Sequence, residues 1–319
     1  MKPLTVGDVL RAKRETLALE LLTEGADLAR TVDDPTIASP GLVLAGFHGR
    51  FAPGRIQVMG ETEIEYLRSL DAAERQSHIG AFLALPVPAV IVTKGLNPPQ
   101  QLIDIAAGLG VPLLRSALKT RELYRRLQPF LEMAFAPTTT VHGSLADVYG
   151  VGLLVIGRSG IGKSECVLDL VERGHRVVAD DVVIVTLRGN DILIGRGHEL
   201  QRHHMEIRGI GIIDVRALFG IRATRLQKRI EVVVQLVDWD DAATYDRTGL
   251  ETEETEILGV KLPRVLIPVN AGKNITVISE VIAMNHLLKY AGVHSARQFD
   301  QSLQDAMRPV RDYLAEDYE

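Results

Sequence analysis

The sequence predicts an α/β protein with an N-terminal α/β domain over residues 1–134, followed by a second domain over residues 135–319 that contains a P-loop and ends in helices. Three observations support this prediction. The chain has 319 residues, more than one compact domain usually contains. Short β-rich runs alternate with helical patterns in both halves. Finally, residues 157–164 match a phosphate-binding loop and lie between a predicted strand and a predicted helix.

The N-terminal domain begins with a leading segment and continues as a small α/β unit. Short β-rich or apolar runs predict strands at residues 55–59, 89–93 and 111–114. Apolar residues at helical spacing predict helices at residues 61–70, 100–109 and 120–134. Pro137 and the threonines at 138–140 mark the domain junction, since proline ends a helix and β-branched residues favour an extended chain.

The second domain alternates strands with one early helix and two late ones. Strands are predicted at residues 152–156, 176–179, 182–187 and 230–239. Helices are predicted at residues 163–173, 280–290 and 298–314. Gly174 is the expected C-terminal cap of the first of these helices.

The composition excludes several classes of protein. Hydrophobic residues make up 46% of the chain and charged residues 24%, which excludes disorder as the main state. A net charge of −5 lacks the strong positive field of a dedicated nucleic-acid binder, so no nucleic-acid partner is expected. The most apolar stretch, residues 79–93, contains two prolines and is too short to span a membrane. A single cysteine, Cys166, is consistent with a reducing compartment and indicates the cytoplasm.

One segment has the pattern G-x-x-x-x-G-K-S that cradles phosphate. Its residues are Gly157, Arg158, Ser159, Gly160, Ile161, Gly162, Lys163 and Ser164. The glycines allow the backbone to wrap round phosphate oxygens, Lys163 adds a positive charge near the β- and γ-phosphates, and Ser164 is the expected magnesium ligand. The alternative is a glycine-rich turn that matches by chance. No N-K-x-D sequence follows the loop, which favours ATP over GTP.

Two adjacent carboxylates, Asp180 and Asp181, follow the predicted strand 176–179. Side chains at strand ends in open α/β sheets reach a ligand bound at the same edge, so one of the two could act as a catalytic base. The pair could instead form a turn or order a magnesium ion. The local sequence does not separate these interpretations.

A second motif covers residues 203–214. Glu206 and Arg208 are two positions apart, so in an extended chain they share a face, where Glu206 could reach a metal and Arg208 could bind that glutamate or a phosphate oxygen. His203 and His204 point to opposite faces of such a strand, which favours structural or surface roles over a metal site.

Two further side chains are candidates for the same site. Arg247 lies in a polar stretch and could stabilise charge on a transferring phosphoryl group, although a solvated arginine is the commoner outcome. His142 precedes the P-loop strand and could reach the loop, although a lone histidine is more often packed or at the surface.

Together these segments resemble the HPr kinase/phosphorylase family. The resemblance rests on residues 157–165, 174–181, 206–213, 245–247 and 268–274, which occur in the family's order. It implies a P-loop-containing kinase domain with C-terminal helices. The implied activity is ATP-dependent phosphorylation of a serine on the phosphocarrier protein HPr, together with phosphate-dependent dephosphorylation that yields pyrophosphate. The implied assembly is a homohexamer.

The resemblance also assigns roles to individual residues. Asp181 becomes the proton acceptor of the kinase reaction and the proton donor of its reverse, and His142, Lys163 and Arg247 are further active-site positions. Ser164 and Glu206 match the magnesium ligands. Residues 205–214 match a signature needed for both activities, and residues 268–273 a stretch linked to dephosphorylation.

One position departs from the family pattern, and two other functions compete. Family members often carry an acidic residue where Arg158 stands, so an added cation could shift phosphate affinity and the balance of the two activities. The competing functions are a P-loop kinase of a small metabolite and a non-catalytic ATP-binding regulatory protein.

Overall fold

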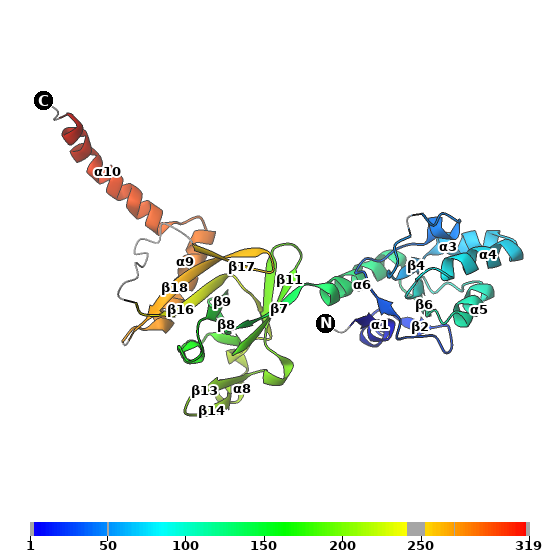
Figure 1. Cartoon of the computed structure of the whole chain (residues 1–319), viewed down its shortest axis with the longest axis horizontal. Coiled ribbons are helices and arrows are strands. Elements are labelled where there is room, and N and C mark those ends of the chain that lie inside the picture. Colours follow the sequence, from blue (N-terminus) through cyan, green and yellow to red (C-terminus); the bar gives the residue numbers. More distant parts are fainter. Residues whose placement is uncertain (1–2, 50, 241–252, 271, 317–319) are drawn as a thin grey trace. The chain divides into compact units, whose positions relative to one another are not determined.

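The computed structural model describes all residues except 1–2, 50, 241–252, 271 and 317–319. The chain divides into two compact units, Met1–Ala136 and Pro137–Glu319, two residues beyond the junction that the sequence predicts. Figure 1 shows helices and strands in both units, in agreement with the α/β prediction. None of the helices in the described ranges has the length and the apolar run that crossing a membrane requires.

The first unit contains a four-stranded sheet with helices on both faces. In spatial order its strands are β2 (Leu19–Leu21), β6 (Leu113–Ser116), β5 (Val90–Val92) and β4 (Gln57–Met59). Strands β4, β5 and β6 are parallel and β2 is antiparallel to β6. A separate pair is formed by β1 (Leu4–Thr5) and β3 (Thr31–Val32). The helices are α1 (Val6–Lys13), α2 (Gly41–Leu44), α3 (Glu61–Ser69), α4 (Ala72–Leu83), α5 (Gln100–Gly108) and α6 (Thr120–Phe135).

Strand β5 shows why this sheet is covered on both faces. Successive side chains of a strand point to opposite sides. Ile91 belongs to one buried cluster, which includes Leu123 of α6, and Val90 and Val92 belong to another, which includes Phe82 of α4. The continuous apolar run at residues 89–92 follows from this double burial.

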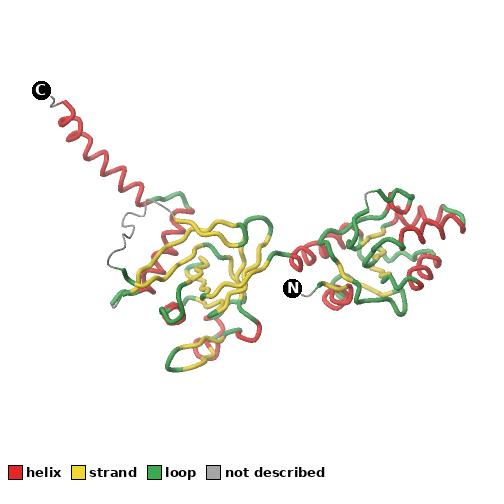
Figure 2. Tube along the Cα trace, in the orientation of Figure 1, coloured by secondary structure: helices red, strands yellow, loops and turns green. Residues whose placement is uncertain are grey.

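The second unit is built on a mixed six-stranded sheet. In spatial order its strands are β10 (Arg176–Ala179), β8 (Ser144–Val148), β9 (Val151–Ile156), β16 (Val232–Asp238), β18 (Val260–Val269) and β17 (Glu253–Ile257). Strands β9, β16 and β18 are parallel to one another. A four-stranded antiparallel sheet has the order β15 (Gln227–Arg229), β12 (Ile192–Arg196), β11 (Val182–Arg188) and β7 (Thr138–His142). Figure 2 shows these strands in yellow, with the helices of the unit in red.

Further elements complete this unit. They are α7 (Lys163–Glu172), α8 (Val215–Phe219), α9 (Ile275–Tyr290), α10 (Ser295–Glu316), the hairpin strands β13 (His204–Ile207) and β14 (Gly211–Asp214), and the short 3₁₀ helices η1 (Glu199–Gln201) and η2 (Ile221–Ala223). The central strand β9 sends Leu153 and Val155 into the core beneath α7 and α9, and Leu154 into the core shared with β11 and β12. The strand that leads into the P-loop is therefore buried on both faces.

The predicted start of the helix at residues 280–290 was wrong by five residues. Helix α9 begins at Ile275, because the Oδ1 atom of Asn274 accepts a hydrogen bond of 3.0 Å from the backbone N–H of Val277. Asparagine is a favoured N-cap residue because its side-chain oxygen can accept a hydrogen bond from a free backbone N–H of the first helical turn. Strands β8, β12, β17 and β18 were not among the strands that the sequence predicted.

Candidate phosphate-binding and catalytic site

Residues 157–162 connect the carboxyl end of β9 to the first turn of α7, as a P-loop requires. Gly157 has a φ of 153°, and a Cβ atom there would lie 2.7 Å from the carbonyl oxygen of Leu236 in β16. Ile161 is 7% exposed and belongs to the core cluster under the sheet. The close approach of Gly157 to β16 and the burial of Ile161 hold the loop against the sheet while its remaining residues face outward.

Lys163 lies over the beginning of the loop. Its Nζ atom donates to the carbonyl oxygens of Gly157 at 3.1 Å and Arg158 at 3.0 Å. Gly162 has a φ of 103° immediately before the helix, a backbone conformation that favours glycine. The Lys163 ammonium and the N-terminus of α7 thus both lie at the P-loop. The positive charge of the first and the free backbone N–H groups of the second both favour binding of an anion there.

Asp180 is the buried carboxylate of the site. Its Oδ1 atom accepts hydrogen bonds from the Oγ atoms of Ser144 at 2.5 Å and Ser164 at 3.0 Å. Burial raises its pKa, whereas these two hydrogen bonds and the nearby backbone amides of Asp181 and Glu206 act in the opposite direction. The Oδ2 atom is buried without a hydrogen-bond partner among the described residues. Asp180 therefore orients the P-loop serine.

Asp181 differs from Asp180 in both exposure and backbone conformation. Its side chain is exposed, and its φ of 65° lies in the left-handed region that few residues other than glycine, asparagine and aspartate adopt. Its carbonyl oxygen accepts a hydrogen bond of 3.0 Å from the backbone N–H of Gly143. His142 is also exposed and pairs with Val182 across β7 and β11, so His142 and Asp181 lie at the same end of these paired strands.

Strand β13 brings the second motif to the P-loop. Met205 and Ile207 are buried in the core while Glu206 and Arg208 are exposed, which agrees with the alternation that the sequence predicted. The Nη2 atom of Arg208 donates to the Oγ atom of Ser159 at 3.4 Å.

The Arg208 guanidinium also packs closely against Gly160 of the loop. A Cβ atom on Gly160 would lie 2.4 Å from Nη1 of Arg208. The arginine is therefore in contact with the P-loop, which favours the phosphate-facing alternative over an ion pair with Glu206. His203 and His204 take no part in a metal-binding group within the described ranges.

Arg158 forms an ion pair that the sequence did not predict. Its Nε and Nη2 atoms donate to the two carboxylate oxygens of Asp238 at 2.5 and 2.7 Å. This contact lowers the pKa of Asp238, through the hydrogen bonds first and the charge second. Asp238 ends β16, the strand beside β9, so the extra cation at position 158 faces a carboxylate within the site.

The structure brings together Lys163, Ser164, Asp180 and the backbone of Glu206, and it places Arg208 on the loop. Arg247 lies outside the described residues. Sequence reasoning missed Ser144 and Asp238. Asp238 carried a signal, because it lies near the end of the predicted strand at residues 230–239, whereas Ser144 carried none.

The donor set fits a magnesium ion. Magnesium is usually held by one or two carboxylates with phosphate oxygens and water, so a cluster of three acidic residues is not needed. Ser164 and Asp180 supply oxygens at the start of α7, and the buried Oδ2 atom of Asp180 has no hydrogen-bond partner in the described part of the chain. Glu206 presents an exposed carboxylate on β13.

A strand, a glycine-rich loop and a helix that begins with a Lys-Ser step, faced by a buried aspartate that follows another strand of the same sheet, define the P-loop class of phosphate-binding proteins. Two family models match this chain, the HPr Serine kinase N terminus over residues 4–131 and the HPr Serine kinase C-terminal domain over residues 133–303. The chain belongs to the HPr serine kinase family.

Two curated relatives agree with this assignment. The HPr kinase/phosphorylase of Geobacter sulfurreducens is 46% identical over 300 residues, which cover 94% of each chain. That of Chloroherpeton thalassium is 45% identical over 293 residues, which cover 92% of this chain and 86% of the relative. A solved structure of the Hpr(Ser) kinase/phosphatase from Coxiella burnetii is 33% identical and covers 48% of this chain and 99% of that chain, with a TM-score of 0.44.

Proposed function

We propose that this protein transfers the γ-phosphoryl group of ATP to a serine of HPr and removes it again by phosphorolysis. One observation carries the proposal. The Asp180 carboxylate accepts a hydrogen bond from Ser164 of the P-loop and is stabilised by the backbone amide of Glu206 in the second motif. Two distant motifs of the family therefore meet beside the exposed carboxylate of Asp181.

In the forward direction the P-loop amides, Lys163 and Arg208 hold the polyphosphate, and Asp180 fixes the orientation of Ser164. Ser164 and Glu206 would hold magnesium, which neutralises phosphate charge when bound. Asp181 accepts the proton of the substrate serine hydroxyl while the serine oxygen bonds to the γ-phosphorus. The bond between the γ-phosphorus and the oxygen that bridges it to the β-phosphate breaks at the same time, and the products are ADP and phosphoserine. His142 and Arg247 would stabilise the charge of the transferring group.

In the reverse direction the same residues act in the opposite order. Inorganic phosphate in the loop attacks the phosphorus of phosphoserine, so a new P–O–P linkage forms while the bond to the serine oxygen breaks. Protonated Asp181 gives its proton to that oxygen, and the products are serine and pyrophosphate. The exposure of Asp181 supports this role, because the substrate serine belongs to another protein and must reach the carboxylate from outside.

The proposal is tested by incubating the purified protein with HPr, ATP and magnesium and measuring phosphoserine, then adding excess phosphate and measuring pyrophosphate. We expect phosphoserine to form first and pyrophosphate to appear as it disappears. Nucleotide binding without transfer to HPr would refute the proposal and would favour the small-metabolite kinase or the regulatory protein.

We extend the proposal to assembly and location. Family membership supports a homohexamer, and the lone cysteine, Cys166, supports action in the cytoplasm. Sedimentation equilibrium of the full chain tests the hexamer, because a mass other than six times 35.0 kDa would exclude it. Cell fractionation tests the location.

A further inference from the structure

A cavity of about 440 Å³ opens beside the P-loop, between the first half of α7 and the start of α9. Its lining includes Gly162 at the end of the loop, Glu165 and Asp169 of α7, and Lys273 and Asn274 just before α9. We call it the α7–α9 cavity. Its volume lies within the range of about 300–1,000 Å³ that is typical of small-molecule sites.

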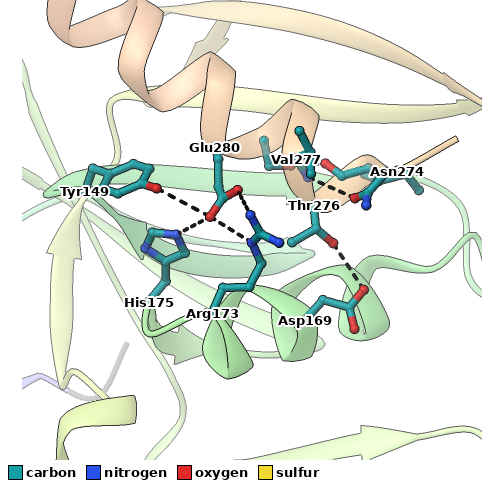
Figure 3. Close-up of polar contacts among 10 residues, drawn as sticks. Tyr149, Asp169, Arg173, His175, Asn274, Thr276, Val277 and Glu280 are labelled. Atoms are coloured by element: carbon teal, nitrogen blue, oxygen red, sulfur yellow. Dashed lines mark hydrogen bonds and ion pairs between the residues drawn. The ribbon is translucent and has the colours of Figure 1, made fainter.

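The walls of this cavity are held in place by side-chain contacts, which Figure 3 shows. The Oγ1 atom of Thr276 donates to Oδ2 of Asp169 at 3.1 Å, which ties the start of α9 to α7. One turn further along, Glu280 of α9 accepts two hydrogen bonds from Arg173 at 2.9 and 2.7 Å. Glu280 also lies 3.0 Å from Nε2 of His175. The two helices that border this open hollow are therefore bonded to each other.

The cavity lies at the end of the P-loop, beside the face of α7 that carries Glu165 and Asp169. Residues 165 and 169 occupy a face of α7 turned away from the face of Ser164, because each residue advances by about 100° round a helix. Ser164, Lys163 and Asp180 mark the end where the β- and γ-phosphates bind. A triphosphate held in this direction would place the part beyond its α-phosphate near Gly162 and Glu165, which both line the cavity.

The sheet topology supports the same direction. In the strand order of the sheet, β10, which Asp180 follows, lies on one side of β9. The cavity lies next to the end of β18, which is on the other side of β9, beyond β16. In open α/β sheets a nucleotide lies across the carboxyl ends of the parallel strands. A nucleotide with its γ-phosphate near Asp180 has its sugar and base near the loop after β18.

The lining has the chemistry of a nucleoside site. Carboxylates such as Glu165 and Asp169 accept hydrogen bonds from ribose hydroxyls, as an acidic residue does in dinucleotide-binding folds. Asn274 adds a side-chain amide, and Ile275 and Cys166 add apolar surface against which a ring can lie. Lys273 offsets part of the negative charge.

We propose that the α7–α9 cavity binds the ribonucleoside of the ATP whose phosphates lie in the P-loop, with Glu165 and Asp169 as acceptors for the ribose hydroxyls. This inference rests on the proposed function, because it assumes that the P-loop holds the triphosphate.

The test is calorimetric titration of the full chain with magnesium and either ATP or inorganic tripolyphosphate. The variant Glu165→Trp places a large ring in the cavity from an exposed position of α7. The matched control is Glu172→Trp, the same change at an exposed position of the same helix outside the cavity. Thermal unfolding of each variant checks that the fold is kept.

We expect Glu165→Trp to weaken ATP binding by about tenfold or more and to change tripolyphosphate binding by no more than about twofold, and we expect Glu172→Trp to change neither. The inference is overturned if Glu165→Trp leaves the affinity for ATP unchanged, or if it weakens both ligands equally. A wild-type protein that binds neither ligand would instead overturn the proposed function.

A second measurement addresses the hydroxyl groups. We expect the wild-type protein to bind 2′-deoxy-ATP or 3′-deoxy-ATP more weakly than ATP, because a site built to hydrogen-bond a hydroxyl discriminates against its absence. Glu165→Gln should reduce that difference. Equal binding of ATP and both deoxy analogues by the wild-type protein would remove the carboxylates from the proposed role.

Discussion

Replacement of Asp181 by asparagine tests the proposed proton acceptor with little effect on the fold. The side chain of Asp181 is exposed, so no core contact is lost. The backbone has a φ of 65°, and asparagine tolerates this left-handed conformation nearly as well as aspartate. Asparagine is therefore a better choice than alanine, which would add backbone strain to the loss of the carboxylate.

The expected magnitudes separate catalysis from stability. Loss of a general base costs about 10²–10⁴-fold in rate. At about 1.4 kcal/mol for each factor of ten, this is about 3–6 kcal/mol of transition-state stabilisation. A surface substitution without lost contacts changes the free energy of unfolding by no more than about 0.5 kcal/mol. The affinity for ATP should also be unchanged, because the loop amides and Lys163 remain.

The assay measures phosphoserine on HPr in the kinase direction and pyrophosphate in the reverse direction, with wild-type protein and Asp181→Asn side by side. Both rates should fall together, since one carboxyl group serves both directions. Unchanged turnover in either direction would remove Asp181 from this role. A fall in rate that is accompanied by a lower unfolding temperature would point to lost structure instead of lost proton transfer.

Three further predictions concern the framework of the second unit. Gly152→Ala should destabilise this unit by at least about 3 kcal/mol in urea unfolding, because its Cβ atom would lie 1.8 Å from the carbonyl oxygen of Arg229. Burial raises the pKa of the Cys166 thiol to about 11, so the native protein should not react with a thiol reagent at pH 8 until it is unfolded. The hydrogen bonds of Arg173 lower the pKa of Glu280, so its contribution to stability is present at neutral pH and is lost as pH falls below about 4.3. Thermal unfolding of wild-type protein and Glu280→Gln across this pH range measures that contribution.

Each of these three predictions has a contradicting result. Wild-type stability in Gly152→Ala would mean that β9 and the strand of Arg229 can separate without cost. Rapid labelling of Cys166 in the native protein would contradict its burial between α7 and α9. Identical acid sensitivity of wild-type protein and Glu280→Gln would show that the Arg173 contact does not favour the charged carboxylate.

The local elements next to the P-loop were predictable from the sequence. The predicted helix at residues 163–173 corresponds to α7, and the predicted strand at residues 176–179 matches β10. Both depend on periodicity and end signals within a few residues of the chain. Strands β8 and β18 escaped prediction, since their identity as strands depends on neighbours that are distant in the sequence.

The sequence by itself determined that a phosphate-binding loop lies between a strand and a helix, because the glycines, the lysine and the serine of that loop act through their spacing along the chain. Only the tertiary structure gave the two aspartates different surroundings. Asp180 is buried and bonds to Ser164 and Ser144, which are 16 and 36 residues away, and Asp181 is left exposed. The α7–α9 cavity arises in the same way, since its walls come from helices joined by a contact between residues 169 and 276. Contacts over such separations depend on how strands and helices pack, and no local pattern of residues encodes them.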